Sequence, residues 1–371
     1  MQIHRSNAGH FLLRVPNKMA SNLILLGTLI LLLCAAAPGC RKEQGKAAAG
    51  ALTGPAPGSL VELSIAEVVF QRDGTPGILL LRPDRRIVLL PVNLCESEVI
   101  YARLHAVPFP RPMTHDLFQR LADGLDLEVP WVVVDRTAED SLTASISLKG
   151  AGRSAEVLAS AGDALAIAQR MSARILGTPR LLSRHTLEAD GPGGMLPRPS
   201  PQAPGAPAQP APRKKTIQFL LSADEPVEMR VLAVVQVLAA DFMILLTDEE
   251  ERSVFPMVID RCQALVISAH LKGREVSSIH THHLLHRLLE VGGAQMTHAG
   301  VVSIQGQTFI GEVGLALGKR RLAIDARPSD AIALALLLGV PIRIARSLVE
   351  EYGEDPESYR DGVESQPRER L

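Results

Sequence analysis

Apolar and polar positions along the second half of the chain predict strands and helices in mixed order. Short runs rich in aliphatic and β-branched residues between turn signals are typical of strands, and apolar residues three and four positions apart are typical of helices. The predicted strands are 229–238, 242–246, 254–258, 299–304, 307–317, 320–325 and 341–345, and the predicted helices are 262–271, 282–291 and 328–338. Strands and helices mixed in this order predict an α+β domain.

The first half of the chain repeats this order at a constant spacing. A Thr-His pair opens at Thr114 and again at Thr281, 167 residues further on. Asp163 and Asp330, which each begin an alanine-rich helical run, are also 167 residues apart. Two separate matches at one offset indicate a tandem duplication. The predicted domains are 58–188 and 226–353, and the first copy has strands at 131–135, 142–148 and 155–158.

The segments outside the two copies have compositions that cannot build a core. Residues 189–225 are rich in proline and are predicted to form an extended linker. Residues 40–57, which are rich in alanine, glycine and proline, are predicted to be a flexible tether. Residues 354–371 carry many acidic side chains, and we expect them to be a solvated, disordered tail.

The amino terminus has the layout of a bacterial lipoprotein signal over residues 1–39. An apolar run at 22–37 follows Arg14 and Lys18, and small residues lead directly to Cys40, which would be the lipidated first residue of the mature protein. An uncleaved amino-terminal anchor is the alternative, and Met19 is an alternative start. Both interpretations place the body of the protein in the bacterial cell envelope, facing the periplasm or the exterior.

Composition limits the expected chemistry. Hydrophobic residues make up 46% of the chain but aromatic residues only 3%, so the cores must be aliphatic. The net charge is −1, and it becomes −4 when the first 39 residues, which carry three basic side chains and no acid, are removed. This overall balance gives no sign of a nucleic-acid binder, and it says nothing about a local basic patch. Cys95 and Cys262 could pair in an exported protein, but they lie in different halves, and we expect them to be buried apolar residues.

The most distinctive segment joins a strand to a helix at 324–336. Asp325 and Asp330 flank Arg327, and Pro328 suits the first helical turn. The segment Asp325-Ala-Arg-Pro-Ser-Asp-Ala-Ile-Ala-Leu-Ala, followed by Gly339-Val-Pro-Ile, resembles the signature of the bifunctional nuclease (BFN) domain family. The resemblance covers about 226–353. It implies a small α+β domain with DNase and RNase activity. The simpler alternative is that the arginine bridges two acids to pin the turn.

Each copy has kept a different half of the family's pattern. The first copy matches the family's second motif, Arg-Pro-x-Thr-His-Asp, at 111–116, and the second copy departs from it at 278–283. The acidic turn of the second copy is replaced at 158–163 by Leu-Ala-Ser-Ala-Gly-Asp. We expect Thr114 and Thr281 to be helix N-caps. The copies could pack as a pseudo-dimer with one composite site, or both could be degenerate. The candidate catalytic residues are Arg111, His115, Asp116, Asp325, Arg327 and Asp330.

Nuclease chemistry assigns roles to several of these residues. His115 could be an acid/base group, Arg327 could hold a phosphate, and Asp325 with Asp330 could hold Mg²⁺ or Mn²⁺. His282 and His286 have the i, i+4 spacing of metal ligands, but a surface cluster that includes His280 and His283 is the simpler interpretation.

Two functions are predicted on this basis. The resemblance implies an exported, envelope-anchored nuclease that hydrolyses DNA or RNA phosphodiesters, with metal assistance. The alternative is a non-catalytic binding or scaffold module of the cell envelope with a degenerate BFN fold. The expected partners are DNA or RNA and the membrane, reached through lipidated Cys40. The copies would associate as an intramolecular pseudo-dimer or as a homo-oligomer.

Overall fold

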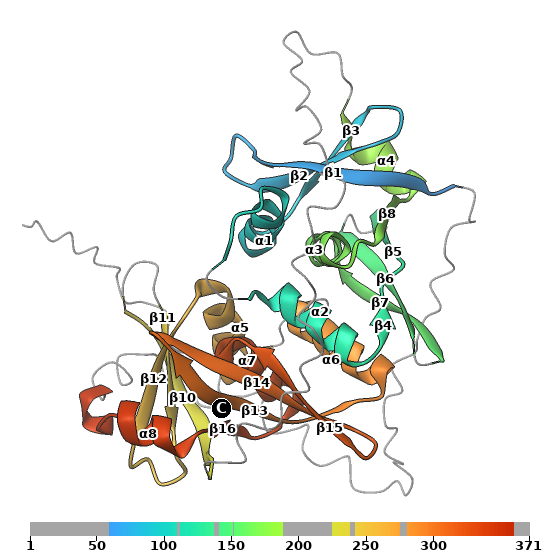
Figure 1. The fold of residues 1–371 in the computed structure, drawn as a ribbon. Coiled ribbons are helices and arrows are strands. Elements are labelled where there is room, and N and C mark those ends of the chain that lie inside the picture. The colour runs from blue at the N-terminus through green and yellow to red at the C-terminus, as the bar shows by residue number, and fades with distance from the viewer. Residues whose placement is uncertain are drawn as a thin grey trace, which may run out of the picture. The chain divides into compact units, whose positions relative to one another are not determined.

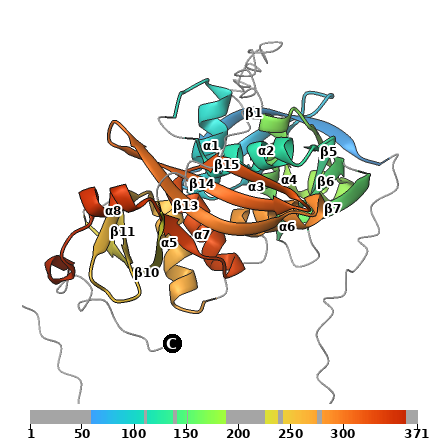
Figure 2. The same ribbon diagram turned by 60° about the horizontal axis from the view of Figure 1, so that its bottom comes forward.

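The chain folds into two mixed sheets, each accompanied by helices (Figures 1 and 2). The computed structural model describes residues 59–109, 112–136, 141–150, 152–187, 225–237, 242–274 and 280–359. The predicted α+β class is confirmed. The predicted signal, tether, lipidation site at Cys40, Pro-rich linker and most of the acidic tail lie outside the described residues. Among the residues that are described, no helix is both long enough and apolar enough to cross a membrane.

The first repeat contributes a nine-stranded sheet and four helices to the described part of the chain. Its strands are β1 (Val61–Phe70), β2 (Pro76–Leu81), β3 (Ile87–Pro91), β4 (Leu127–Glu128), β5 (Trp131–Arg136), β6 (Leu142–Gly150), β7 (Arg153–Ser160), β8 (Arg174–Gly177) and β9 (Thr186–Leu187). Its helices are α1 (Leu94–Leu104), α2 (Thr114–Gly124), α3 (Ala161–Met171) and α4 (Pro179–His185). The strand order is β4-β6-β5-β8-β1-β2-β3-β9, and β7 pairs with β6.

The second repeat contributes a seven-stranded sheet in the order β12-β11-β10-β16-β13-β14-β15. Its strands are β10 (Val227–Gln236), β11 (Phe242–Thr247), β12 (Val254–Ile259), β13 (Gln295–Gln305), β14 (Thr308–Leu317), β15 (Arg320–Ala326) and β16 (Ile342–Ile344). Its helices are α5 (Arg261–Leu271), α6 (Thr281–Gly292), α7 (Pro328–Leu338) and α8 (Arg346–Tyr352), followed by the 3₁₀ turn Pro356–Tyr359.

Strand pairing confirms the duplication at the level of individual residues. In each sheet a single parallel pair joins the middle strands, with Val132 opposite Ile175 in the first repeat and Ala299 opposite Ile342 in the second. Both partners in the second pair lie 167 residues after those in the first. The other named strand pairs are antiparallel, as expected for hairpins and meanders with short connections.

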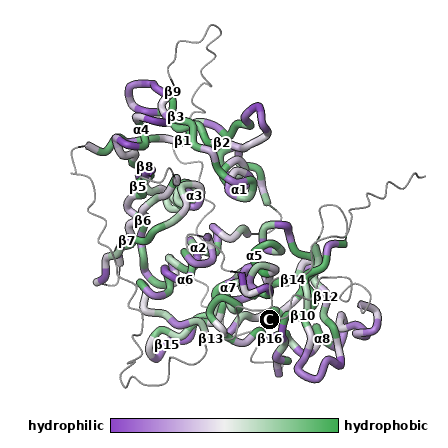
Figure 3. The backbone as a smooth tube through the Cα atoms, turned by 180° about the vertical axis from the view of Figure 1, so that it is seen from behind, coloured by the Kyte–Doolittle hydropathy of each residue, from purple (hydrophilic) through white to green (hydrophobic). Residues whose placement is uncertain are grey.

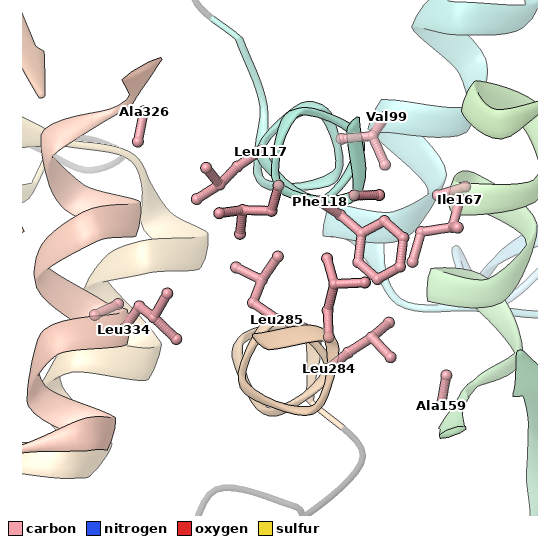
Figure 4. Packing of buried hydrophobic residues seen from close by; sticks show 14 of the residues in the cluster. Val99, Leu117, Phe118, Ala159, Ile167, Leu284, Leu285, Ala326 and Leu334 are labelled. Carbon is pink, nitrogen blue, oxygen red and sulfur yellow. The ribbon is translucent and has the colours of Figure 1, made fainter. Parts of the chain in front are cut away.

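Helices α2 and α6 join the repeats into one core. They pack against each other, and each also packs on the last long strand of the opposite repeat, α2 on β15 and α6 on β7. Leu117 and Phe118 of α2 face Leu284 and Leu285 of α6 (Figure 4). All four side chains are at most 2% exposed. Because this burial of aliphatic surface is continuous across both repeats, the hydrophobic effect holds them together as one unit.

Local patterns predicted the second repeat well, because its strands and helices lie within a few residues of the expected ranges. Two short helices, α4 and α8, were not predicted. The sequence carried a signal for α4, since Thr178 accepts the amide of Leu181 and Pro179 occupies the first turn. The α8 helix has no side-chain cap, so no comparable signal marked its start.

Cys95 and Cys262 form a disulfide, which corrects the expectation that they are unpaired core residues. Their Cα atoms are 6.2 Å apart, and their sequence separation is 167 residues, which equals the repeat offset. Each cysteine is the second residue of its helix, in α1 and α5. The bond therefore links equivalent positions of the two repeats. The matching separation was the signal in the sequence, but its meaning depends on how the repeats face each other.

Reduction of this disulfide is expected to destabilise the folded protein. A cross-link that closes so long a loop restricts the unfolded chain, and removing one typically costs about 2–5 kcal/mol. Urea unfolding of residues Gly54–Leu371, the compact unit that contains the described residues, should show a lower midpoint with dithiothreitol. The Cys95→Ser/Cys262→Ser variant should unfold at that lower midpoint with or without the reductant. Equal midpoints for the oxidised and fully reduced protein would contradict the prediction.

Candidate functional site

The predicted motif residues meet in a buried polar network where the repeats pack together. The network is centred on the first turns of four helices, α2 and α3 from the first repeat and α6 and α7 from the second, and residues at the starts of α1 and α5 complete it. It consists of two half-sites whose residues correspond at the offset of 167. The central carboxylates are Asp163 and Asp330, which are 2% and 0% exposed.

Asp330 is bound by donors from both repeats. Its Oδ1 accepts from Thr114 Oγ1 at 2.9 Å and from Gln263 Nε2 at 3.0 Å. Arg327 binds the same carboxylate through Nε at 2.7 Å and Nη2 at 3.2 Å. His282 Nε2 lies 3.5 Å from Oδ1. A carboxylate that is removed from water is stable only when its oxygens are paired in this way.

Arg327 has no N–H group left for a substrate. Beyond Asp330, its Nη1 donates to Asp260 Oδ2 at 2.7 Å and contacts Met113 Sδ at 3.5 Å, and its Nη2 donates to Thr114 Oγ1 at 3.0 Å. With the two bonds to Asp330, these contacts use all five guanidinium hydrogens. The sequence left open whether this arginine is locked or available to a phosphate, and the geometry shows that it is locked.

The first half-site has the same plan with different side chains. Asp163 Oδ1 accepts from Thr281 Oγ1 at 2.7 Å and lies 2.8 Å from His115 Nε2. Ser160 stands where the second repeat has Arg327. Its hydroxyl accepts the amide of Asp163 and donates to Glu96. The first half-site therefore lacks the cationic clamp on its aspartate and keeps the threonine and imidazole contacts.

Each threonine serves the opposite repeat. Thr114 binds Asp330, and Thr281 binds Asp163, so the contact is reciprocal. The prediction that both threonines are N-caps is wrong. The cap positions are Met113 and His280, and each threonine is the first helical residue. Local propensity was overridden because a buried carboxylate across the interface is a stronger acceptor than the helix's own amides.

Burial and pairing shift the acidity of these groups in different directions. Burial alone would raise the pKa of Asp330, but Arg327 and His282 hold it well below its usual range. Burial raises the pKa of Glu96 to about 7, and the charge of Asp163 adds to the effect. Burial also lowers the pKa of His280 to about 4, helped by repulsion from His282. Near neutral pH the first half-site therefore has a carboxyl that still holds part of its proton.

Two other predicted catalytic acids lie apart from these carboxylates, and Arg111 lies outside the described residues. Asp116 pairs with Arg170, with 2.6 Å between Oδ1 and Nε. The Asp325 side chain is 50% exposed at the edge of the second sheet, 4.0 Å from Arg120 Nη1. The structure thus brings His115, Arg327 and Asp330 into one network and leaves these two acids in separate ion pairs.

The residues do not fit a magnesium or manganese ion held by Asp325 and Asp330. The oxygens of Asp330 already accept four hydrogen bonds, so a cation there would have to displace Arg327. Asp325 lies at an exposed edge with different neighbours. Across the described ranges, no group of three or more histidine, cysteine or acidic side chains has a geometry that could hold a metal ion.

The histidines are divided between the network and the surface. His282 is 3% exposed beside Asp330, so it is no part of a surface cluster, contrary to the simpler interpretation. His286, which shares its helix, is partly exposed and lies 3.6 Å from Glu290 Oε1. His280 stacks on His282, with ring centroids 5.4 Å apart. The i, i+4 pair therefore faces two separate environments.

Sequence reasoning gave no role to several members of the network. Gln263 and Asp260 lie at the start of α5 and carry no family motif that we identified. Glu96 corresponds to Gln263 in the first repeat. The available signal was the alignment of the repeats, which pairs Glu96 with Gln263 and Ser160 with Arg327. Only the packing of α2 against the second repeat explains why these positions matter.

A cavity of about 200 Å³ lies beside the start of α7. Arg327, Pro328 and Ser329 line one part of it, and residues 256–259 of β12 line another. This volume is below the roughly 300–1,000 Å³ of ordinary small-molecule sites. The cavity therefore borders Arg327 but is small for a nucleotide.

Replacing Asp330 should destabilise the fold strongly. Asp330→Asn leaves Arg327 buried with its main counter-charge removed, and breaking a buried pair typically costs about 3–5 kcal/mol. Asp325→Asn is the matched control, because this half-exposed residue should change stability by less than about 0.5 kcal/mol. Urea unfolding measures both. Since the pKa of Asp330 is depressed in the folded protein, its ionised carboxylate contributes fully to stability above about pH 4, and this contribution declines at lower pH. The difference in unfolding free energy between wild type and Asp330→Asn should therefore shrink in acid. Equal stability of the two variants would contradict this assignment.

Replacing Glu96 should stabilise the protein in alkali. The folded pKa of about 7 lies above the ordinary 4.5, so stability is lost as the pH rises through this interval. Glu96→Gln, which installs the residue found at position 263, should raise the free energy of unfolding by about 1–3 kcal/mol above pH 7 and leave it little changed near pH 4.5. The reverse change, Gln263→Glu, should destabilise in alkali. A stability difference between Glu96→Gln and wild type that does not vary with pH would show that the carboxyl is not perturbed.

Comparison with known proteins agrees with this architecture. The family profile described as "Bifunctional nuclease domain" matches residues 78–190 and 244–357. Two uncharacterised proteins of Mycobacterium tuberculosis, from strains CDC 1551 and H37Rv, are each 28% identical to this chain over 111 residues. That match covers 30% of this chain and 66% of the length of each relative. Together with the tandem sheets, the two profile matches show that the chain belongs to the bifunctional nuclease domain family and carries two copies of the domain.

Proposed function

We propose that this chain is a non-catalytic nucleic-acid-binding module of the cell envelope, in which the family's motif residues hold two BFN domains together. The observation that carries the proposal is the Arg327–Asp330 pair. The carboxylate is fully buried, and every N–H of the guanidinium is bound to protein. A phosphodiester at Arg327 would have to displace these protein partners. Family membership supports nucleic acid as the ligand.

Catalysis at the motif would carry a high energetic cost. Hydrolysis of a phosphodiester needs groups that touch the phosphate or its attacking water. His115 is 5% exposed, and its Nε2 is committed to Asp163. Opening the interface would expose the shared hydrophobic core and leave two carboxylates without their threonine donors. The disulfide between α1 and α5 opposes such an opening.

A nuclease of the bifunctional type is the second candidate function. The observation that favours it is that the two halves of the family pattern, split between the repeats, meet across the interface. Thr114 belongs to the Arg-Pro-x-Thr-His-Asp motif and Asp330 to the acidic turn, and they form a direct hydrogen bond. In this alternative the network is the closed state of a composite site, and a divalent cation would enter when it opens.

We also propose that the protein is exported. The disulfide supports this location, because such bonds persist in oxidising compartments. A lipid anchor at Cys40 is the corresponding proposal for its attachment to a membrane.

A cleavage assay tests the choice between the two functions. Residues Gly54–Leu371 would be incubated with labelled single-stranded DNA and RNA, in Mg²⁺, Mn²⁺ or chelator. We expect binding without cleavage in every condition. Metal-dependent cleavage that is lost in Asp330→Asn but retained in Asp325→Asn would establish the nuclease instead. Because Asp330→Asn is expected to be destabilised, the assay would be run at a temperature where circular dichroism shows that it is folded. His115→Gln provides a second variant in the other half-site.

A further inference from the structure

The two repeats have opposite charges at corresponding places on their surfaces. In the first repeat, the turn before β3 and helix α4 carry a group of exposed or partly exposed arginines, here called the arginine surface. Its members are Arg82, Arg85, Arg86, Arg180 and Arg184. In the second repeat, the turn before β12 and helix α8 carry exposed glutamates, here called the glutamate surface. Its members are Glu249, Glu250, Glu251, Glu350 and Glu351. Figure 3 shows both regions coloured as hydrophilic.

The turn and the helix of the arginine surface are physically joined. Arg82 Nη1 donates to Thr186 Oγ1 at 3.4 Å, which ties the turn to the end of α4. β3 also pairs with β9, the strand that follows this helix. Asp84 binds both Arg82 and Arg86, and Asp135 of β5 binds Arg180, with 3.2 Å between Oδ2 and Nη2. The five arginines outnumber these two acids, so the surface keeps an excess of positive charge.

The corresponding turn and helix of the second repeat carry different charges. The turn before β12 is closed by the pairing of β11 with β12, as the turn before β3 is closed by the pairing of β2 with β3. Each turn holds a charged residue in the left-handed region, Arg85 with φ 66° and Glu251 with φ 54°, but the two are not equivalent, because Arg85 corresponds to Arg252. Arg86 and Arg180 correspond to Ser253 and Ser347, and Arg184 corresponds to Glu351. The paired ends Leu81–Ile87 and Thr247–Val254 enclose five and six residues, so the turns differ in length. The equivalent elements nevertheless carry mainly positive charge in one repeat and mainly negative charge in the other.

We infer that the arginine surface is the docking site for the phosphate backbone of a single-stranded nucleic acid. This inference rests on the proposed binding function and says which face performs it. A guanidinium donates two parallel hydrogen bonds to a phosphate, and several along one surface can follow a polyanion without a shaped pocket. The glutamate surface repels the same ligand, so binding is confined to the first repeat. This location is consistent with the net charge of −1 for the whole chain, because the positive charge is local.

A second copy of the chain fits the same surface less well. Contact between the arginine surface of one molecule and the glutamate surface of another would join different faces, and such head-to-tail contacts form open chains unless they close into a ring. A flexible polyanion needs no such closure. Self-association is therefore an outcome that the experiment must distinguish.

Fluorescence anisotropy with a labelled single-stranded oligonucleotide tests the inference. We expect residues Gly54–Leu371 to bind with strong salt dependence. Arg86→Ser/Arg180→Ser installs the residues found at positions 253 and 347 and should weaken binding at least tenfold at low salt. The slope of log K against log salt should fall by roughly 0.7 for each phosphate that the variant no longer neutralises. The matched control is Arg252→Ser/Arg346→Ser, which removes two arginines beside the glutamate surface and should leave binding unchanged. Unchanged circular dichroism would show that both variants are folded.

The other possible outcomes separate the failure of the arginine surface from the failure of the proposed function. If wild type binds and Arg86→Ser/Arg180→Ser binds equally well, the surface is wrong and the proposed function stands. If wild type does not bind at low salt, both fail. Cleavage of the oligonucleotide would overturn the non-catalytic proposal and leave the surface intact. Concentration-dependent sedimentation that the arginine variant loses, without oligonucleotide binding, would assign the surface to a second copy. Binding to phosphatidylglycerol vesicles that oligonucleotide does not displace would assign it to a membrane.

Discussion

The reciprocal hydrogen bonds from Thr114 to Asp330 and from Thr281 to Asp163 determine how the two repeats fit together. Each aspartate lies in a dry interface, where an ionised carboxylate without donors would be very costly. A necessary donor for each comes from the other repeat. The aliphatic core between α2 and α6 supplies most of the attraction, but apolar contacts are non-directional. The threonine–aspartate pairs select one relative position of the two repeats among the many that an apolar interface alone would allow.

Duplication within one chain explains why the half-sites could become different. In a symmetric dimer of identical subunits, any substitution alters both half-sites together. Here Arg327 neutralises one aspartate, while Ser160 occupies the same position beside the other. Without that positive charge, burial and the charge of Asp163 raise the pKa of the neighbouring Glu96 to about 7, so this second acid keeps part of its proton near neutral pH. A Cβ at Gly162 would overlap the Glu96 carboxylate, so this solution also excludes the serine found at position 329.

Local chemistry made much of the fold predictable, and long-range packing limited the rest. Strands and helices of the second repeat followed from apolar spacing, and the duplication followed from two motif pairs at one offset. The N-cap role of Thr114 was wrong, because its hydroxyl finds a stronger acceptor in Asp330. The Cys95–Cys262 bond was missed because a separation of 167 residues has meaning only once the repeats are known to face each other. The burial of His282 was missed for the same reason.

A sequence motif that is typical of a ligand site can instead hold two domains together when its residues lie in the interface between them. Arg327 and Asp330 are residue types that are common in phosphate-binding sites. Here, however, their hydrogen bonds are made to protein groups and stabilise the interface between the repeats. What such a protein recognises must then be sought on residues that the interface leaves outside. The exteriors of the two repeats differ in sign of charge, while their interiors share one plan of aspartate, histidine and threonine. Packing accounts for the shared interior, but it places no demand on an exposed arginine or glutamate. The proposed binding of a nucleic acid therefore depends on the difference in surface charge and not on the motif residues.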